Sequence, residues 1–74
     1  MNIEKEIKEW LKNIAYNYNH DIETNLYLEL LNLSKHFGLD MRRIDEKYQH
    51  YSPGEKTTEK ELYSLLKDQI EEVE

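Results

Sequence analysis

Three histidines are the residues of this chain best suited to hold a metal ion: His20, His36 and His50. A protein metal site needs three or four converging ligands, and two histidines four positions apart are one way to place two of them on a single helix face. No two of these histidines have that spacing. Glu46 and His50 do have it, but such a pair is typical of an exposed helix surface. We therefore expect no metal site.

A catalytic nucleophile is also missing from the sequence. There is no cysteine, no serine stands in a glycine elbow, and the two glycines are too far apart to form a phosphate-binding loop. The many carboxylates fall on predicted exposed helix faces, and acid–base catalysis would require their burial to shift a pKa. We therefore expect neither enzymatic activity nor a cofactor.

The segment KHFGLDMRRI, residues 35–44, resembles the corner of a DNA-binding helix-turn-helix in its spacing. A small residue, Ser34, stands four positions before Gly38, apolar residues flank the glycine, and Ile44 follows six positions after it. Lys47 departs from the pattern, because a second buried aliphatic residue should stand there. The helix after this corner would present these side chains outward: Arg42, Arg43, Lys47, Gln49 and His50.

The same corner has a simpler interpretation, in which Gly38 ends one helix and Asp40 begins the next. Arginine is the side chain that most often reads guanine, so Arg42 and Arg43 would suit a recognition helix. Acidic residues stand among these basic residues, however, and the neighbouring segments of the chain supply no cluster of basic residues to bind the phosphates. A helix-turn-helix regulator is therefore the alternative interpretation, and nucleic acid is not the expected partner.

Length and charge set limits on the class of protein. Seventy-four residues suffice for one helical domain, 1–74, and a chain this short buries only about 60% of its unfolded surface. The net charge is −6 and is unevenly spread: −3 over residues 21–40, +1 over 41–54 and −4 over 55–74. An acidic chain repels nucleic acid and anionic lipid but suits a basic protein partner.

The sequence contains no apolar run long enough to span a bilayer, and its first residues lack the apolar core of a signal peptide. We therefore expect a cytoplasmic protein with no membrane association. Lysine, asparagine, isoleucine and tyrosine are frequent, which suggests an A+T-rich coding sequence of a bacterium or phage.

Apolar residues recur at helical spacing in four segments, which predicts an all-α fold, a compact four-helix bundle. The predicted helices span 3–18, 22–37, 41–50 and 59–73, and the third is short. Four side chains are suited to cap their first turns: Asn2, Asp21, Asp40 and Thr58.

Some apolar side chains do not fit on the core stripes of these helices. The second helix has a main stripe from Ile22 to Phe37, but Tyr27, Leu28 and Leu31 point well away from it at 100° per residue. Tyr16 points roughly opposite the core stripe of the first helix. If exposed, the three residues of the second helix form an apolar patch of a kind that monomers usually avoid. Either other helices of this chain or another chain covers them.

These observations favour a small acidic protein without enzymatic activity that binds a protein partner, either a basic protein or a second copy of itself as a dimer. Small acidic helical proteins of this kind act as inhibitors, immunity factors or regulatory adaptors. The order of two long helices, a short helix with tyrosines and a fourth helix is similar to that of the colicin-type nuclease immunity proteins. The predicted interaction residues are Tyr16, Tyr27, Leu28 and Leu31.

Overall fold

The computed structural model describes residues 2–20 and 22–73, and at position 73 the backbone alone. Within these residues every regular secondary-structure element is a helix, and there is no strand. The all-helical prediction is confirmed, but the described residues form five helices where the sequence predicts four. The helices are α1 (Ile3–Asn19), α2 (Leu26–Phe37), α3 (Met41–Tyr48), α4 (Glu59–Ser64) and α5 (Lys67–Val73).

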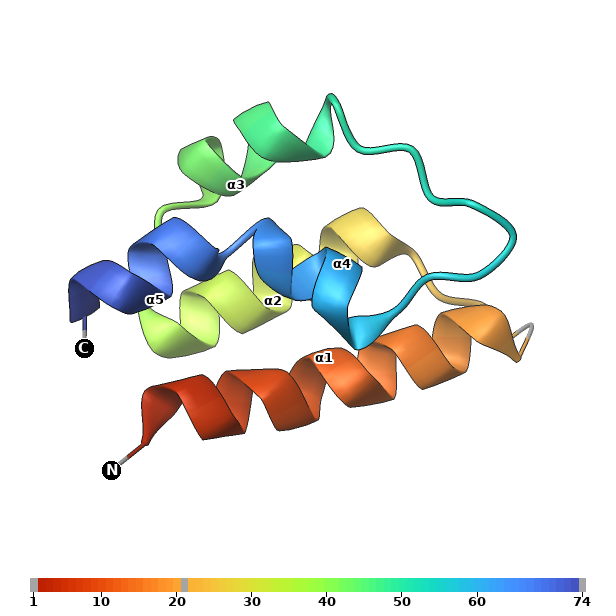
Figure 1. Ribbon diagram of the computed structural model, residues 1–74, viewed down its shortest axis with the longest axis horizontal. Helices are drawn as coiled ribbons and strands as arrows, with labels where there is room; N and C mark the ends of the chain where they lie inside the picture. The colour runs from red at the N-terminus through yellow and green to blue at the C-terminus, as the bar shows by residue number, and fades with distance from the viewer. Residues whose placement is uncertain (1, 21, 74) are drawn as a thin grey trace.

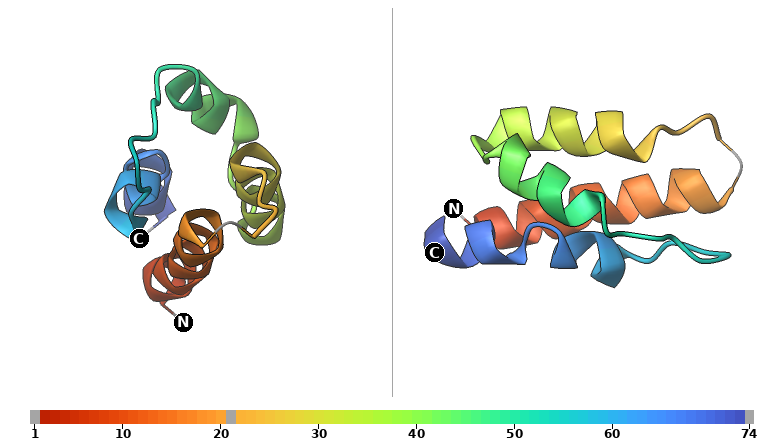
Figure 2. Two further views of the ribbon diagram at one scale, coloured as in Figure 1. Left: turned by 90° about the vertical axis from the view of Figure 1, so that its right-hand side faces the viewer. Right: turned by 90° about the horizontal axis from the view of Figure 1, so that it is seen from above.

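The helices surround one core in a molecule of 33 × 25 × 18 Å. α2 runs back along α1, α3 returns in the opposite direction, and a long loop leads to α4 and α5, which follow one another end to end (Figure 1). Viewed along the molecule, α2 and the α4–α5 pair lie on opposite sides, with α1 below and α3 above (Figure 2). No helix of the described residues is both long and apolar enough to cross a membrane.

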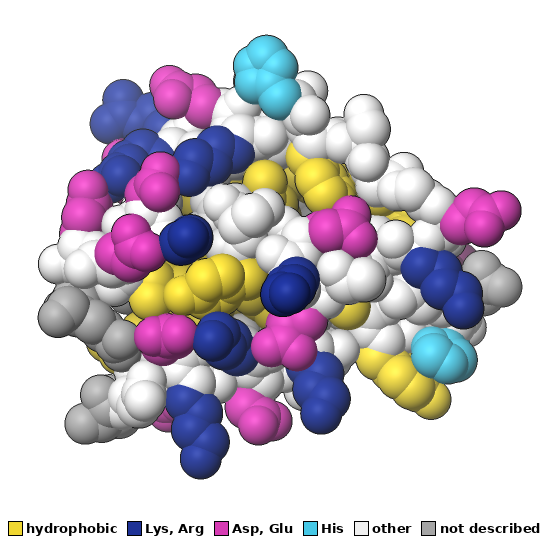
Figure 3. Space-filling model, in the orientation of Figure 1, with side chains coloured by type: hydrophobic (Ala, Val, Ile, Leu, Met, Phe, Trp, Pro, Cys, Tyr) yellow, Lys and Arg dark blue, Asp and Glu magenta, His cyan; other side chains and the backbone are white. Residues whose placement is uncertain are grey.

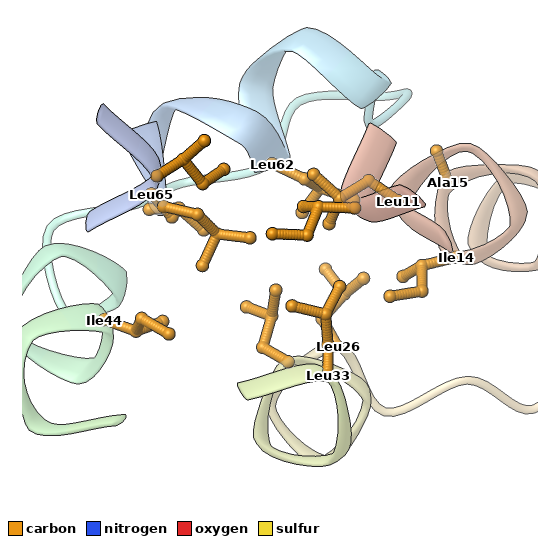
Figure 4. Packing of buried hydrophobic residues seen from close by; sticks show 12 residues of the cluster. Leu11, Ile14, Ala15, Leu26, Leu33, Ile44, Leu62 and Leu65 are labelled. Atoms are coloured by element: carbon orange, nitrogen blue, oxygen red, sulfur yellow. The ribbon is translucent and has the colours of Figure 1, made fainter. Parts of the chain in front are cut away.

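The core is made of aliphatic side chains contributed by the helices on all sides of this arrangement (Figure 4). Aromatic residues, among them Trp10, Tyr18 and Tyr48, are only partly buried and pack around it. The periodicity of the predicted helix over 59–73 also places Val73 inward, but the side chain of Val73 lies outside the described part of the chain. The buried hydrophobic residues are Ile7, Leu11, Ile14, Ala15, Leu26, Leu30, Leu33, Ile44, Leu62, Leu65, Leu66 and Ile70.

Most of the predicted helix ends are confirmed, because capping is local chemistry. Asn2, Asp40 and Thr58 each accept a hydrogen bond from a backbone N–H of the turn that follows. Gly38 ends α2 with φ at 70°, and the N–H of the next residue donates to the carbonyl of Ser34 at 2.8 Å. This left-handed stop is the one predicted for the corner. α3 ends at Tyr48 instead of continuing to position 50.

The prediction for the start of the second helix is wrong: α2 begins at Leu26, not at position 22. The predicted cap Asp21 lies outside the described residues, and Asn25 caps the helix instead. The N–H of Ile22 still donates to the carbonyl of Asn17 at 3.2 Å, so the chain remains attached to the end of α1. Ile22, predicted to lie on the core stripe, is therefore 50% exposed.

The predicted single helix over 59–73 is also wrong, because it is broken between α4 and α5. The Ser64 hydroxyl donates to the carbonyl of Glu61 at 2.6 Å, and that carbonyl is the acceptor that the N–H of Leu65 would use in a continuous helix. The Leu65 N–H instead donates to the carbonyl of Leu62 at 3.1 Å. The resulting tight turn allows Leu65 and Leu66 to be buried side by side.

Two side-chain amides attach distant segments to one another. Gln69 of α5 accepts from the N–H of Asp40 at 2.6 Å and donates to its carbonyl at 3.0 Å, which fixes the α2–α3 corner. Asn19 of α1 makes the same pair of bonds with the backbone of Thr57, at 2.7 and 2.9 Å. Among the described residues, no buried side-chain polar atom lacks a hydrogen-bond partner.

Candidate protein-interaction surface

The outer side of α2 carries an apolar strip, defined here as Tyr27, Leu28 and Leu31. Leu31 is four residues after Tyr27 and three after Leu28, so the three side chains are neighbours on the helix surface. Leu28 is 52% exposed and Tyr27 is 36% exposed, whereas Leu31 is half-buried. Other helices of this chain therefore leave the strip partly uncovered.

Tyr16, the fourth predicted interaction residue, belongs to a different surface. It is 57% exposed on α1, and its ring stacks on His20 with the two ring centroids 3.9 Å apart. His20 Nδ1 lies 2.7 Å from the carbonyl oxygen of Tyr16, which fixes this stack at the end of the helix. The structure therefore brings together three of the four predicted residues and separates Tyr16 from them.

Beside the strip lies a shallow groove of about 580 Å³ that is open to solvent, which we call the tyrosine groove. Tyr27 lies next to this groove. Its ring packs edge-on against the ring of Tyr48, which lines the groove, with the two ring centroids 5.7 Å apart. The ring centroid of Tyr48 in turn lies 6.0 Å from that of Tyr51. The groove is lined by Tyr18, Glu23, Thr24, Asn25, Leu26, Tyr48 and Pro53.

The sequence did not reveal this groove. The periodicity of α1 and α3 predicts Tyr18 and Tyr48 as core residues, and both do pack on the core while remaining half-buried. The available signal was the number of tyrosines, six in 74 residues, since tyrosine is enriched at interfaces. Their convergence depends on the path of the loop that carries Pro53, which no periodicity encodes.

Two basic side chains of α3 are paired with carboxylates of α5, whereas the helix-turn-helix alternative requires them to be free for DNA. Arg43 pairs with Glu72 of α5 through two hydrogen bonds of 2.7 and 3.2 Å. Lys47 pairs with Asp68 at 2.6 Å. The hydrogen bonds from Arg43 hold the pKa of Glu72 below its ordinary value, and the hydrogen bond from Lys47 does the same to the pKa of Asp68.

These pairs divide the predicted DNA-binding set. Arg42 and Gln49 are exposed, whereas Arg43 and Lys47 are engaged with carboxylates that would repel a phosphate backbone. The face formed by α4 and α5 shows acidic and basic side chains interspersed (Figure 3). On that face, carboxylates therefore interrupt the basic side chains of the described residues (Figure 3).

The histidines are far from forming one site. The ring centroids of His36 and Trp10 are 5.1 Å apart, and the ring of His20 stacks on that of Tyr16. His50 lines a separate groove between α3 and α4. Within the described residues, no three side chains of histidine, cysteine, aspartate or glutamate are arranged to hold a metal ion.

Comparisons with protein-family models, with curated proteins and with solved structures find no match to this chain.

Proposed function

We propose that the chain is a small non-enzymatic interaction module, of the inhibitor, immunity or regulatory adaptor type, that binds a basic protein through the apolar strip of α2. The observation that carries the proposal is the exposure of Leu28 and Tyr27 next to Leu31 on one helix face. Contiguous apolar side chains in water are unfavourable, and a partner that covers them removes that cost.

The strip alone is too small for a strong interface. A stable complex buries about 800 Å² on each partner, far more than three partly exposed side chains provide. The tyrosine groove extends the surface, because the rings of Tyr27 and Tyr48 are in contact. Tyrosine is also among the residues that carry most of the binding energy in interfaces.

Charge favours a basic partner over a second copy of the chain. Two copies that each carry −6 repel one another, whereas a basic protein is attracted and steered to the surface. Beside the strip, Glu23 is the one charged residue among those that line the tyrosine groove, so a basic side chain of the partner would be attracted there.

The test is affinity capture from a lysate of the source organism, with nuclease treatment and mass spectrometry. Three baits are compared: the wild type, Leu28→Asp in the strip, and Asn13→Asp on α1 as the matched control. Leu28 and Asn13 are both exposed helix positions, so each change adds one charge without filling or emptying the core. Leu31 is half-buried, which makes Leu28 the cleaner position to alter.

We expect a basic protein to be retained after nuclease treatment by the wild type and by Asn13→Asp, and to be lost with Leu28→Asp. Equal retention by all three baits would contradict the role of the strip. Recovery of DNA, with loss of protein partners after nuclease treatment, would favour the helix-turn-helix alternative through Arg42.

A further inference from the structure

The walls of the tyrosine groove are held in place before any partner arrives. The ring of Tyr48 contacts two other tyrosine rings, with centroids 5.7 Å from that of Tyr27 and 6.0 Å from that of Tyr51. The loop that carries Pro53 is attached at its far end to α1 through the two hydrogen bonds between Asn19 and the backbone of Thr57. A groove that is already formed binds more tightly, because less conformational entropy is lost on association.

The groove offers hydrogen-bond donors that pair with no other residue of the described part of the chain. The Tyr51 hydroxyl donates to Thr57 at 3.4 Å, and burial raises the pKa of this hydroxyl. The hydroxyls of Tyr18 and Tyr48, by contrast, make no hydrogen bond to another described residue. A ligand that presents carbonyl oxygens would therefore find two donors beside flat aromatic faces.

The groove also selects the charge of its ligand. Glu23 is the one charged residue among those that line it, and the chain as a whole carries −6. A lysine or arginine next to the apolar part of the ligand would be attracted to Glu23, while a carboxylate would be repelled.

An extended proline-containing segment has the chemistry that these features require. Its polyproline II backbone forms no internal hydrogen bonds, so its carbonyls are free to accept from tyrosine hydroxyls. Proline rings pack on aromatic side chains, and the rigid segment loses little entropy on binding, as in other aromatic-lined grooves that recognise proline. A helix, in contrast, already uses its carbonyls internally.

We propose that the tyrosine groove binds an extended segment that contains proline and an adjacent lysine or arginine. This inference rests on the proposed function, since the segment belongs to the basic partner whose body covers the apolar strip. Tyr18 and Tyr48 donate to backbone carbonyls of the segment, their rings and Pro53 contact its prolines, and Glu23 pairs with its basic side chain.

The probe is a fluorescein-labelled octaproline peptide that ends in one arginine, titrated with the full chain and followed by fluorescence anisotropy. We expect saturable binding with one peptide per chain. A peptide with glutamate in place of the arginine should bind about tenfold more weakly, because Glu23 repels it. An alanine-rich helical peptide with one arginine should not bind measurably.

Conservative variants test the contacts without emptying the core. Tyr18→Phe and Tyr48→Phe remove only a hydroxyl, and each should weaken binding by roughly fivefold, the effect of one hydrogen bond. Glu23→Gln should abolish the preference for arginine over glutamate. Tyr16→Phe and Glu71→Gln are the matched controls outside the groove and should leave the affinity unchanged.

The proposal is overturned if octaproline does not saturate the wild type, if the helical peptide binds equally well, or if Tyr16→Phe weakens binding as much as Tyr48→Phe. These failures are distinct from failure of the proposed function. If the basic partner is captured in a way that depends on Leu28 while octaproline does not bind, the strip is the binding surface and the inference about the groove is wrong.

Discussion

At the scale of single residues, side-chain amides determine how the helices of this chain are held together. Gln69 is 6% exposed and satisfies both backbone groups of Asp40, at the corner between α2 and α3. A peptide unit that loses such a partner in a partly buried place is left without compensation for its lost hydration. Gln69 therefore attaches α5 to the corner.

Replacement of Gln69 by leucine tests this role. We expect Gln69→Leu to lower the free energy of unfolding by about 1–3 kcal/mol, because the N–H and carbonyl of Asp40 lose their partner. Gln49→Leu is the control, since Gln49 is exposed, and should change stability by no more than about 0.5 kcal/mol. Urea denaturation followed by circular dichroism measures both. Equal costs for the two variants would show that Gln69 is not a special contact.

At the scale of helices, the sequence predicts what local chemistry determines. The caps Asn2, Asp40 and Thr58 and the stop at Gly38 are found where predicted, because each depends on residues within a few positions. The break between α4 and α5 was not predicted. A leucine-rich periodic segment gives no sign that the Ser64 hydroxyl occupies a helix carbonyl.

Contacts between distant segments escaped the prediction for a different reason. Gln69 and Asp40 are 29 positions apart, and Asn19 and Thr57 are 38 apart, so no periodicity or spacing relates them. The candidate surface divides in the same way. The strip on α2 follows from helix geometry alone, whereas the tyrosine groove requires three segments to be brought together by the fold.

The contact between α3 and α5 should depend on pH. Lys47 and Arg43 hydrogen-bond to Asp68 and Glu72, which lowers the pKa values of these carboxyls below their ordinary 3.8 and 4.5. A group whose pKa is lower in the folded chain stabilises the fold above its ordinary pKa, and this stabilisation disappears as the pH falls through the folded value.

We therefore expect the wild type to be more stable than the double variant Asp68→Asn with Glu72→Gln at about pH 7, and the difference to vanish at about pH 2. Thermal denaturation at a series of pH values measures this. Glu71→Gln is the control on the same helix, because no ion pair links Glu71 to another described residue. A difference that persists at the lowest pH would contradict the electrostatic explanation.

At the scale of the whole molecule, the charge and the exposed apolar side chains lead to the same expectation. The net charge of −6 disfavours self-association, and the α4–α5 face carries interspersed charges of both signs (Figure 3). The apolar strip belongs to α2, and α2 and the α4–α5 pair lie on opposite sides of the molecule (Figure 2). A basic partner seated there would cover the strip and approach the groove without disturbing the ion pairs between α3 and α5.

The central claim is that the outer side of α2 touches another protein, and the most direct measurement is site-specific photo-crosslinking in cells. A benzophenone amino acid replaces Leu28 in one chain and Asn13 in another, and adducts are resolved by mass spectrometry after irradiation. We predict one discrete adduct with a basic protein from position 28 and none from position 13. No adduct from position 28, the same products from both positions, or only an adduct between two copies of this chain would contradict the account.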